Sequence, residues 1–143
     1  MSVKKLNKKG FSLVELLTTI AILGILMSVA VGAVTIYLNR TREQAMDTIA
    51  SSSYDGMVNY MMEKNILLNP KGEPNSSATI DIETLFEEQY IEKPIDPYNK
   101  GTTCKGTVTV TNETSSATVG LADYRYQVEV RCSGGHKIEK QYP

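Results

Sequence analysis

The sequence lacks most of the groups from which an active site is built. It has one histidine, His136, which lies beside a predicted turn and is interpreted as a surface residue. Its two cysteines, Cys104 and Cys132, are not spaced with histidines or acids as in a zinc site or a thiol protease, and no glycine-rich phosphate loop is present. Oxygen ligands for calcium are available from Asp96, Asn99 and the acids at 81–92, but they do not follow EF-hand spacing. The favoured interpretation is a solvated acidic helix and an ordinary turn, with calcium binding as the alternative. The sequence therefore predicts no enzyme, no cofactor and no metal site.

Acidic residues are missing from the first part of the chain, and all charged residues are missing from the part that follows Glu15. The first ten residues hold four of the 15 basic residues and none of the 16 acidic ones. Without them 11 basic and 16 acidic residues remain, which gives a net charge of −5. Such a product is not expected to have a basic face for nucleic acid, so direct binding to nucleic acid is not expected. The short basic block is better explained by membrane orientation.

Residues 16–39 carry no charged side chain, and this run is long enough to cross a membrane. As a helix it would extend ~36 Å at ~1.5 Å per residue, and a bilayer core is ~30 Å thick. The preceding lysines favour a cytoplasmic N-terminus, which leaves the rest of the chain outside. A cleaved secretory signal, an uncleaved signal anchor and a buried core helix compete as explanations, and the length disfavours the last.

Glu15 separates these explanations. A carboxylate does not belong in the apolar region of a signal peptide or of a simple anchor, because a charge at the bilayer centre costs roughly 2.5–3.5 kcal/mol. Glu15 lies four residues after Phe11 and so starts near the cytoplasmic interface, where the cost is smaller. In a bundle of such helices the carboxylate would be buried and would need a cationic partner.

The stretch Lys8-Lys9-Gly10-Phe11-Ser12-Leu13-Val14-Glu15-Leu16-Leu17 resembles the leader-peptidase site of type IV prepilins and pseudopilins. The resemblance covers about the first quarter of the chain. It implies that the prepilin peptidase, a membrane aspartyl enzyme, cuts between Gly10 and Phe11 and then N-methylates Phe11. It also implies that the new α-amino group of Phe11 pairs with Glu15 of a neighbouring subunit during assembly.

On this resemblance the chain is a structural subunit of a type IV pilus-like filament. Its partners would be other copies of itself, the membrane, the prepilin peptidase, the assembly platform protein and minor pilins. The precursor would be a single-pass protein of the inner (cytoplasmic) membrane, and the assembled filament would be extracellular or on the cell surface. Two alternatives remain: a pseudopilin of a type II secretion or competence DNA-uptake system, and a membrane-anchored extracellular binding domain with a conventional signal.

No proline interrupts residues 11–69, which favours one helix from about Phe11 to Asn65. After Thr41 its apolar residues recur at spacings of three and four or their sums, which is typical of an amphipathic helix: Met46, Ile49, Met57, Tyr60 and Met61. The sequence thus predicts four segments: a leader peptide (1–10), a transmembrane and assembly half-helix (11–39), an amphipathic half-helix (40–65) and a globular head (66–143).

The head is predicted to be α+β, with an antiparallel sheet packed on the amphipathic half of the long helix, as in pilins. Residues 81–90 are expected to form a short helix between loops rich in turn residues. Segments 104–112 and 122–132 alternate apolar and polar residues and are expected to be strands, with a third through 136–141. Two triplets match the glycosylation sequon, which is short and frequent: Asn75-Ser76-Ser77 and Asn112-Glu113-Thr114.

One register of these strands satisfies two requirements at once. Antiparallel pairing with Val108 opposite Val128 places the apolar side chains of both strands on one face. The same register places Cys104 opposite Cys132. The coincidence predicts a Cys104–Cys132 disulfide in a compartment outside the reducing cytosol.

Overall fold

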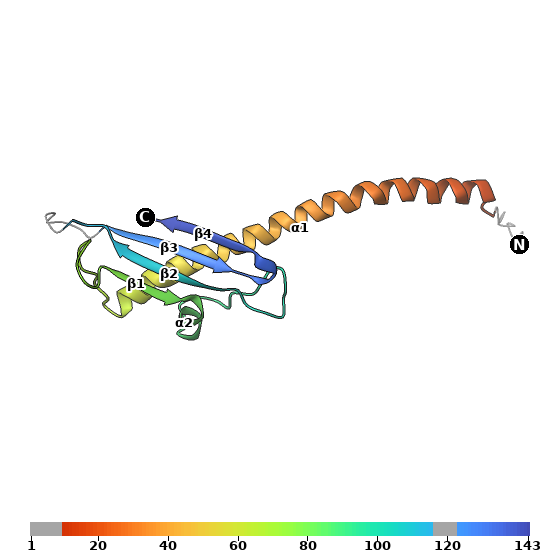
Figure 1. Cartoon of the computed structure of the whole chain (residues 1–143). Helices are drawn as coiled ribbons and strands as arrows, with labels where there is room; N and C mark the ends of the chain where they lie inside the picture. The colour runs from red at the N-terminus through yellow and green to blue at the C-terminus, as the bar shows by residue number, and fades with distance from the viewer. Residues whose placement is uncertain (1–9, 116–122) are drawn as a thin grey trace, which may run out of the picture. The chain divides into compact units, whose positions relative to one another are not determined.

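The computed structural model describes residues 10–115 and 123–143 (Figure 1). Its elements follow the order α1, β1, α2, β2, β3, a short 3-10 turn and β4. The chain divides into two compact units, Met1–Arg40 and Thr41–Pro143. Helix α1, Leu13–Glu63, contributes to both units, and the sheet and α2 belong to the second.

In the first unit, the large apolar side chains of α1 are exposed, from 46 % for Leu38 to 82 % for Leu13. Hydroxyl groups within this stretch donate to carbonyl oxygens three or four residues back, at 2.7–2.9 Å, from Thr18, Thr19, Ser28 and Thr35. Because these polar groups are satisfied inside the helix, they add little cost in lipid. Among the described residues, α1 is the one helix long and apolar enough to cross a membrane.

Helix α1 ends because Asn65 adopts a left-handed conformation, with φ of 52°. The N–H of Ile66 then donates to the carbonyl of Met61 at 2.9 Å, which is the Schellman pattern of a helix C-terminus. The predicted helix is confirmed to within two residues at each end, since it begins at Leu13 and ends at Glu63.

The four strands form one antiparallel sheet in the order β1-β2-β3-β4. Their bounds are Ser77–Asp81 for β1, Lys105–Asn112 for β2, Tyr124–Arg131 for β3 and Lys137–Tyr142 for β4. The predicted register is confirmed, because Val108 is paired with Val128 and Val110 with Tyr126. Strand β4 is the expected third strand, whereas β1 was not predicted. Ala122, in the predicted segment 122–132, lies outside the described residues.

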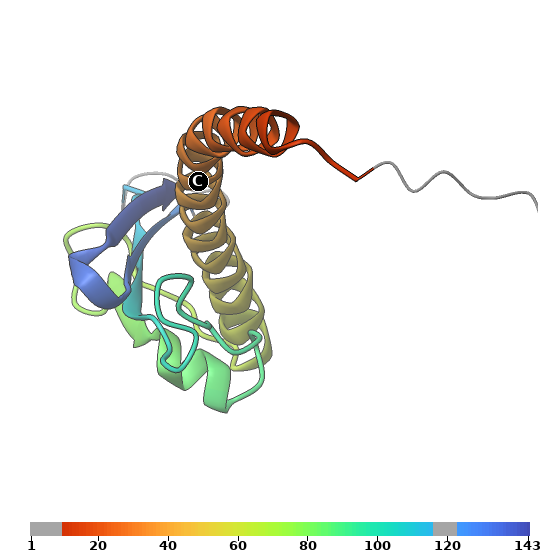
Figure 2. The same cartoon turned by 90° about the vertical axis from the view of Figure 1, so that its right-hand side faces the viewer.

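The core of the second unit lies between the sheet and the second half of α1, which runs along one face of the strands (Figures 1 and 2). The buried side chains come from alternate strand positions and from one stripe of the helix: Ala50, Met57, Met61, Val108, Val110, Tyr126, Val128 and Val130. Tyr54 joins the two layers. Its ring packs edge-on against Tyr126, with ring centroids 5.0 Å apart, and stacks on Tyr142, with ring centroids 4.6 Å apart. The predicted α+β fold is confirmed.

Helix α2, Ile82–Glu87, is shorter than the predicted 81–90 segment. It ends where Gln89 takes a positive φ of 65° and the N–H of Tyr90 bonds the carbonyl of Leu85 at 2.9 Å. Asp81 occupies the N-cap position, but its side chain makes no capping hydrogen bond. Ile82 and Leu85 are fully buried, so α2 closes one end of the core.

Candidate processing and assembly site

The start of α1 coincides with the predicted cleavage site. Ser12 precedes the first helical residue, and its Oγ accepts the backbone N–H of Glu15 at 3.2 Å. The carbonyl of Ser12 accepts the N–H of Leu16 at 3.1 Å, which is the first bond of the helix. Ser12 is therefore the N-cap, and Ser12-Leu13-Val14-Glu15 has the spacing of a capping box.

Because the cap lies at Ser12, the Gly10–Phe11 peptide bond is outside the regular helix. Gly10 is exposed, an added Cβ there would meet no atom within 4 Å, and Phe11 is 80 % exposed. Exposed, irregular backbone near a chain end is where proteases act most readily. The geometry leaves this bond open to a peptidase.

Glu15 occupies the third helical position, where the positive end of the helix dipole favours a carboxylate. It is exposed, and no cation within residues 10–115 or 123–143 forms an ion pair with it. In an apolar surrounding the carboxylate would therefore need a cationic partner that the described residues do not supply.

The contribution of Ser12 was missed by sequence reasoning, which treated it only as part of the processing motif. The signal was available, since Ser followed three residues later by Glu is the pattern of a helix start. The cap explains why helical structure begins two residues after the predicted cut.

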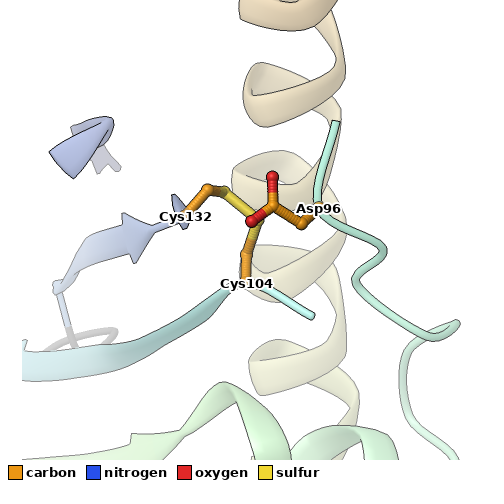
Figure 3. Close-up of side chains that lie close together, drawn as sticks. All are labelled: Asp96, Cys104 and Cys132. Carbon is orange, nitrogen blue, oxygen red and sulfur yellow. A yellow bond between two sulfur atoms is a disulfide. The ribbon is translucent and has the colours of Figure 1, made fainter. Parts of the chain in front are cut away.

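A second group of residues considered in the sequence analysis lies in the Thr41–Pro143 unit. Cys104 and Cys132 form a disulfide with a Cα–Cα distance of 4.4 Å, which confirms the predicted pairing. It closes the end of the β2–β3 pair just beyond Lys105 and Arg131. Figure 3 shows the carboxylate of Asp96 directly beside this disulfide.

Asp96 is 1 % exposed and uses both carboxylate oxygens as hydrogen-bond acceptors. Oδ1 accepts the backbone N–H groups of Tyr98 at 2.7 Å and Asn99 at 3.1 Å. Oδ2 accepts the N–H of Ser133 at 2.7 Å and the hydroxyl of Thr102 at 3.3 Å. Burial alone would raise the pKa of Asp96, but the bonds from Ser133, Tyr98 and Asn99 outweigh it and lower the pKa to about 2.

The same three residues, Asp96, Cys104 and Cys132, place one possible ligand atom each within 4.8 Å of the others. Sulfur binds metals as thiolate, and here both sulfur atoms are joined in the disulfide. The carboxylate oxygens already accept four N–H or O–H donors. The arrangement is therefore that of a structural crosslink, in which Asp96 holds its own loop and the turn at Ser133.

The side chain of Asn112 is also buried and holds two backbone segments together. It is 3 % exposed, its Nδ2 donates to the carbonyl of Leu68 at 3.0 Å, and its Oδ1 accepts the N–H of Thr114 at 2.9 Å. An amide nitrogen held in this way cannot carry a glycan in the folded chain. The sequon at Asn112 is thus explained by packing between the Leu68 loop and the end of β2.

Comparison with protein families matches residues 5–31 to the prokaryotic N-terminal methylation motif. The matched residues include most of the basic flank, the Gly10–Phe11 bond, Glu15 and two thirds of the uncharged run 16–39. Comparisons with curated proteins and with solved structures gave no match. The methylation motif therefore describes the segment in which the helix cap, the exposed peptide bond and the single acid occur together.

Proposed function

From the methylation motif at residues 5–31, which is the hallmark of type IV pilins and pseudopilins, we propose that this chain is the main repeating subunit of a type IV pilus-like filament. The prepilin peptidase removes residues 1–10 and methylates Phe11. The mature subunits then polymerise through residues 11–39, and the chain has no catalytic role.

The observation that carries this proposal is the placement of the motif at the helix start. Ser12 caps α1, so a cut after Gly10 releases a chain that begins one residue before the cap and keeps the whole helix. A conventional signal sequence would be cut near residue 33 and would lose the first half of α1. Both the motif and the helix boundary therefore support the first cut.

The exposed apolar half of α1 supports storage in a membrane followed by polymerisation. Exposure of such an apolar surface to water is unfavourable in free energy, and contact with lipid tails or with the same helices of other subunits removes that exposure. The lysines of the leader favour a cytoplasmic N-terminus, so the Thr41–Pro143 unit is placed outside the membrane. An oxidising compartment there fits the Cys104–Cys132 disulfide.

Glu15 supplies the register for assembly in this proposal. Cleavage creates an α-amino group on Phe11, which has a typical pKa of about 7.7–8.0 and is largely cationic at neutral pH. Within a bundle of apolar helices an unpaired charge is costly, so a position that joins this amine to the Glu15 carboxylate of a neighbour is favoured. The retained Glu15 and the single small head support a repeating subunit rather than a tip subunit.

The mature N-terminus tests the proposal directly. We expect mass spectrometry of protein from cells with an active prepilin peptidase to find a chain that begins at Phe11 and carries one N-methyl group. In cells without the peptidase, the chain should retain the leader residues that precede Phe11. A start near residue 33, or an intact Met1 despite active peptidase, would overturn the proposal in favour of a conventional membrane-anchored or secreted domain.

A matched pair of variants sharpens this test. Gly10→Val adds bulk at the cleavage site and should block processing, whereas Gly10→Ala adds only a methyl group and should be cut to a measurable extent. Neither change should alter the rest of the fold, because a Cβ at Gly10 meets no described atom within 4 Å.

A further inference from the structure

Three side chains from distant parts of the Thr41–Pro143 unit meet in one cluster. The guanidinium carbon of Arg42 lies 5.5 Å from the centroid of the Tyr98 ring. The rings of Tyr98 and His136 are stacked, with their centroids 3.6 Å apart and an angle of 4° between their planes. Arg42 belongs to α1, Tyr98 to the loop between α2 and β2, and His136 to the connection between β3 and β4. The cluster is at the surface, since His136 is exposed and the other two are half-buried.

The cluster is held in place by the Asp96 hydrogen bonds. The carboxylate accepts the N–H of Tyr98 itself and the N–H of Ser133, three residues before His136. One buried group thus fixes both segments that supply the stacked rings. A surface ordered in advance loses little conformational entropy when it binds a partner.

The cluster is also tied closely to the membrane-spanning segment. The uncharged run ends at Asn39, and Arg42 follows three residues later. Three residues span at most ~10 Å even when fully extended. The headgroup layer on each side of a bilayer core is roughly 5–8 Å thick. Chain connectivity alone therefore keeps Arg42 at or next to the lipid headgroups.

The charge of the cluster suits phosphate groups. Arg42 forms no ion pair with any described carboxylate, and Lys100, exposed two residues after Tyr98, forms none either. By contrast, Lys137 pairs with Glu129 and Lys140 pairs with Asp47. Arginine and tyrosine also suit the membrane–water interface, because each side chain has an apolar body and a polar tip.

We propose that Arg42, Tyr98, Lys100 and His136 form a docking surface for the phosphate headgroups of the outer leaflet. The Thr41–Pro143 unit of a membrane-resident subunit rests on the bilayer through this surface. The inference depends on the proposed function only in that residues 11–39 must span the membrane. Extraction of a subunit into a filament then requires these lipid contacts to break as well as the helix to leave the bilayer.

The absence of tryptophan from the chain allows a clean test. Tyr98→Trp introduces one fluorophore that can still stack on His136. The full chain is reconstituted in vesicles of three parts phosphatidylcholine to one part phosphatidylglycerol. A nitroxide is carried either on the lipid headgroup or deep in the acyl chain. We expect the headgroup nitroxide to quench the probe at position 98 roughly twofold or more over the deep one, because the headgroup layer is the site of contact.

Leu67→Trp is the matched control. Leu67 is 85 % exposed, so a probe there is accessible. It follows the end of α1, which extends ~30 Å between Arg42 and Glu63, so the probe is far from the proposed docking surface. The probe at position 67 should show no preferential quenching by either nitroxide. In the Tyr98→Trp background, Arg42→Gln with Lys100→Gln should reduce the headgroup quenching, and so should vesicles of phosphatidylcholine alone.

The result that overturns the inference is equal quenching at positions 98 and 67 in chains that resist carbonate extraction. Fluorescence at position 98 that responds only to added subunits would also overturn it, because the cluster would then be a contact between subunits. A chain that carbonate removes from the vesicles would instead refute the membrane span, and with it the proposed function.

Discussion

The carboxylate of Asp96 accepts the backbone N–H of Ser133 at 2.7 Å across 37 residues of sequence. The bond joins the loop after α2 to the turn before β4. It lies beside the Cys104–Cys132 disulfide, which joins neighbouring points of the same two regions (Figure 3). One covalent and one hydrogen-bonded link thus close the same end of the sheet.

This bond predicts a specific acid sensitivity. The pKa of Asp96 is about 2 in the folded chain and 3.8 in an ordinary aspartate. The unfolded chain therefore binds the proton first as pH falls, and stability drops between about pH 4 and pH 2. The full contribution, about 2 kcal/mol from the pKa difference, is present above about pH 5.

Urea unfolding of the wild type and of Asp96→Asn at pH 2 to 6 measures this contribution. Asp96→Asn should be less stable at pH 6, and the gap should narrow toward pH 2. Parallel pH profiles for the two proteins would show that Asp96 does not supply the acid-sensitive part of the stability.

Removal of the disulfide should destabilise the Thr41–Pro143 unit without changing its fold. The crosslink closes a loop with a sequence separation of 28 residues. A loop of this length is worth about 3–4 kcal/mol in the chain-entropy account. Cys104→Ser with Cys132→Ser should lower the free energy of unfolding by about that amount, measured by denaturant titration with circular dichroism. A loss below about 1 kcal/mol would mean that Asp96 and the core already fix this end of the sheet.

Gly56 should not tolerate a side chain, although it lies in a helix where alanine is normally preferred. A Cβ there would lie 2.3 Å from Cγ2 of Ile91 and 3.3 Å from the carbonyl oxygen of Tyr90. Alanine gains about 1 kcal/mol of helix propensity, but overpacking of this kind costs about 1–3 kcal/mol. We expect Gly56→Ala to lower the thermal midpoint.

The companion variant Ile91→Ala removes the atom in closest contact. If the clash is the cause, the double variant should be less destabilised than the sum of the two single changes, a coupling that a double-mutant cycle measures. Additive effects would point to a cause other than this contact.

The buried side-chain amide of Asn112 should contribute more to the free energy of unfolding than an exposed amide does. Asn112→Ala leaves the carbonyl of Leu68 and the N–H of Thr114 without their partners and should cost about 1–3 kcal/mol. Asn59→Ala, at an exposed position of α1, should be neutral or slightly stabilising. Equal unfolding free energies for the two variants would contradict the structural account of Asn112.

Glu15→Gln separates membrane insertion from assembly. The change keeps the size of the side chain and suits the third helical position, so insertion and cleavage should be unaffected. Filament yield should fall at least tenfold, on the order of 1.4 kcal/mol or more per subunit docking step, because the Phe11 amine loses its partner. The yield is counted by electron microscopy of sheared material.

Ser12→Ala provides the control for Glu15→Gln. It removes the N-cap hydrogen bond, at a cost of about 1 kcal/mol, but leaves the charge of Glu15 intact. Filaments from Ser12→Ala should persist. Normal filaments from Glu15→Gln would exclude the pairing role.

The parts predicted best from sequence were those with a long or repeated pattern. The period of the amphipathic half-helix and the alternation of β2 and β3 each repeat over several residues, so they defined the packing face. The β2–β3 register followed because a shift by one residue would have turned Val108 and Val128 to the opposite face.

The parts that were missed depend on single residues and on contacts between distant segments. Strand β1 has only Ala78 and Ile80 as alternating apolar positions, and its pairing with β2 makes it a strand. Asp96 was interpreted as a turn residue, since no local pattern reveals that its second oxygen reaches Ser133. Helix α2 is shorter than predicted because Gln89 adopts a left-handed conformation that nothing in its sequence requires.

Strands β1 and β4 are the two edges of the sheet. Open edges carry unpaired backbone groups and invite the edges of other molecules to join them. Strand β4 carries three charged residues that disfavour such pairing, Lys137, Glu139 and Lys140. These charges discourage two molecules from pairing through their β4 edges. Under the proposed function, they favour the exposed apolar residues of α1 over this edge as the surface by which one subunit recognises another.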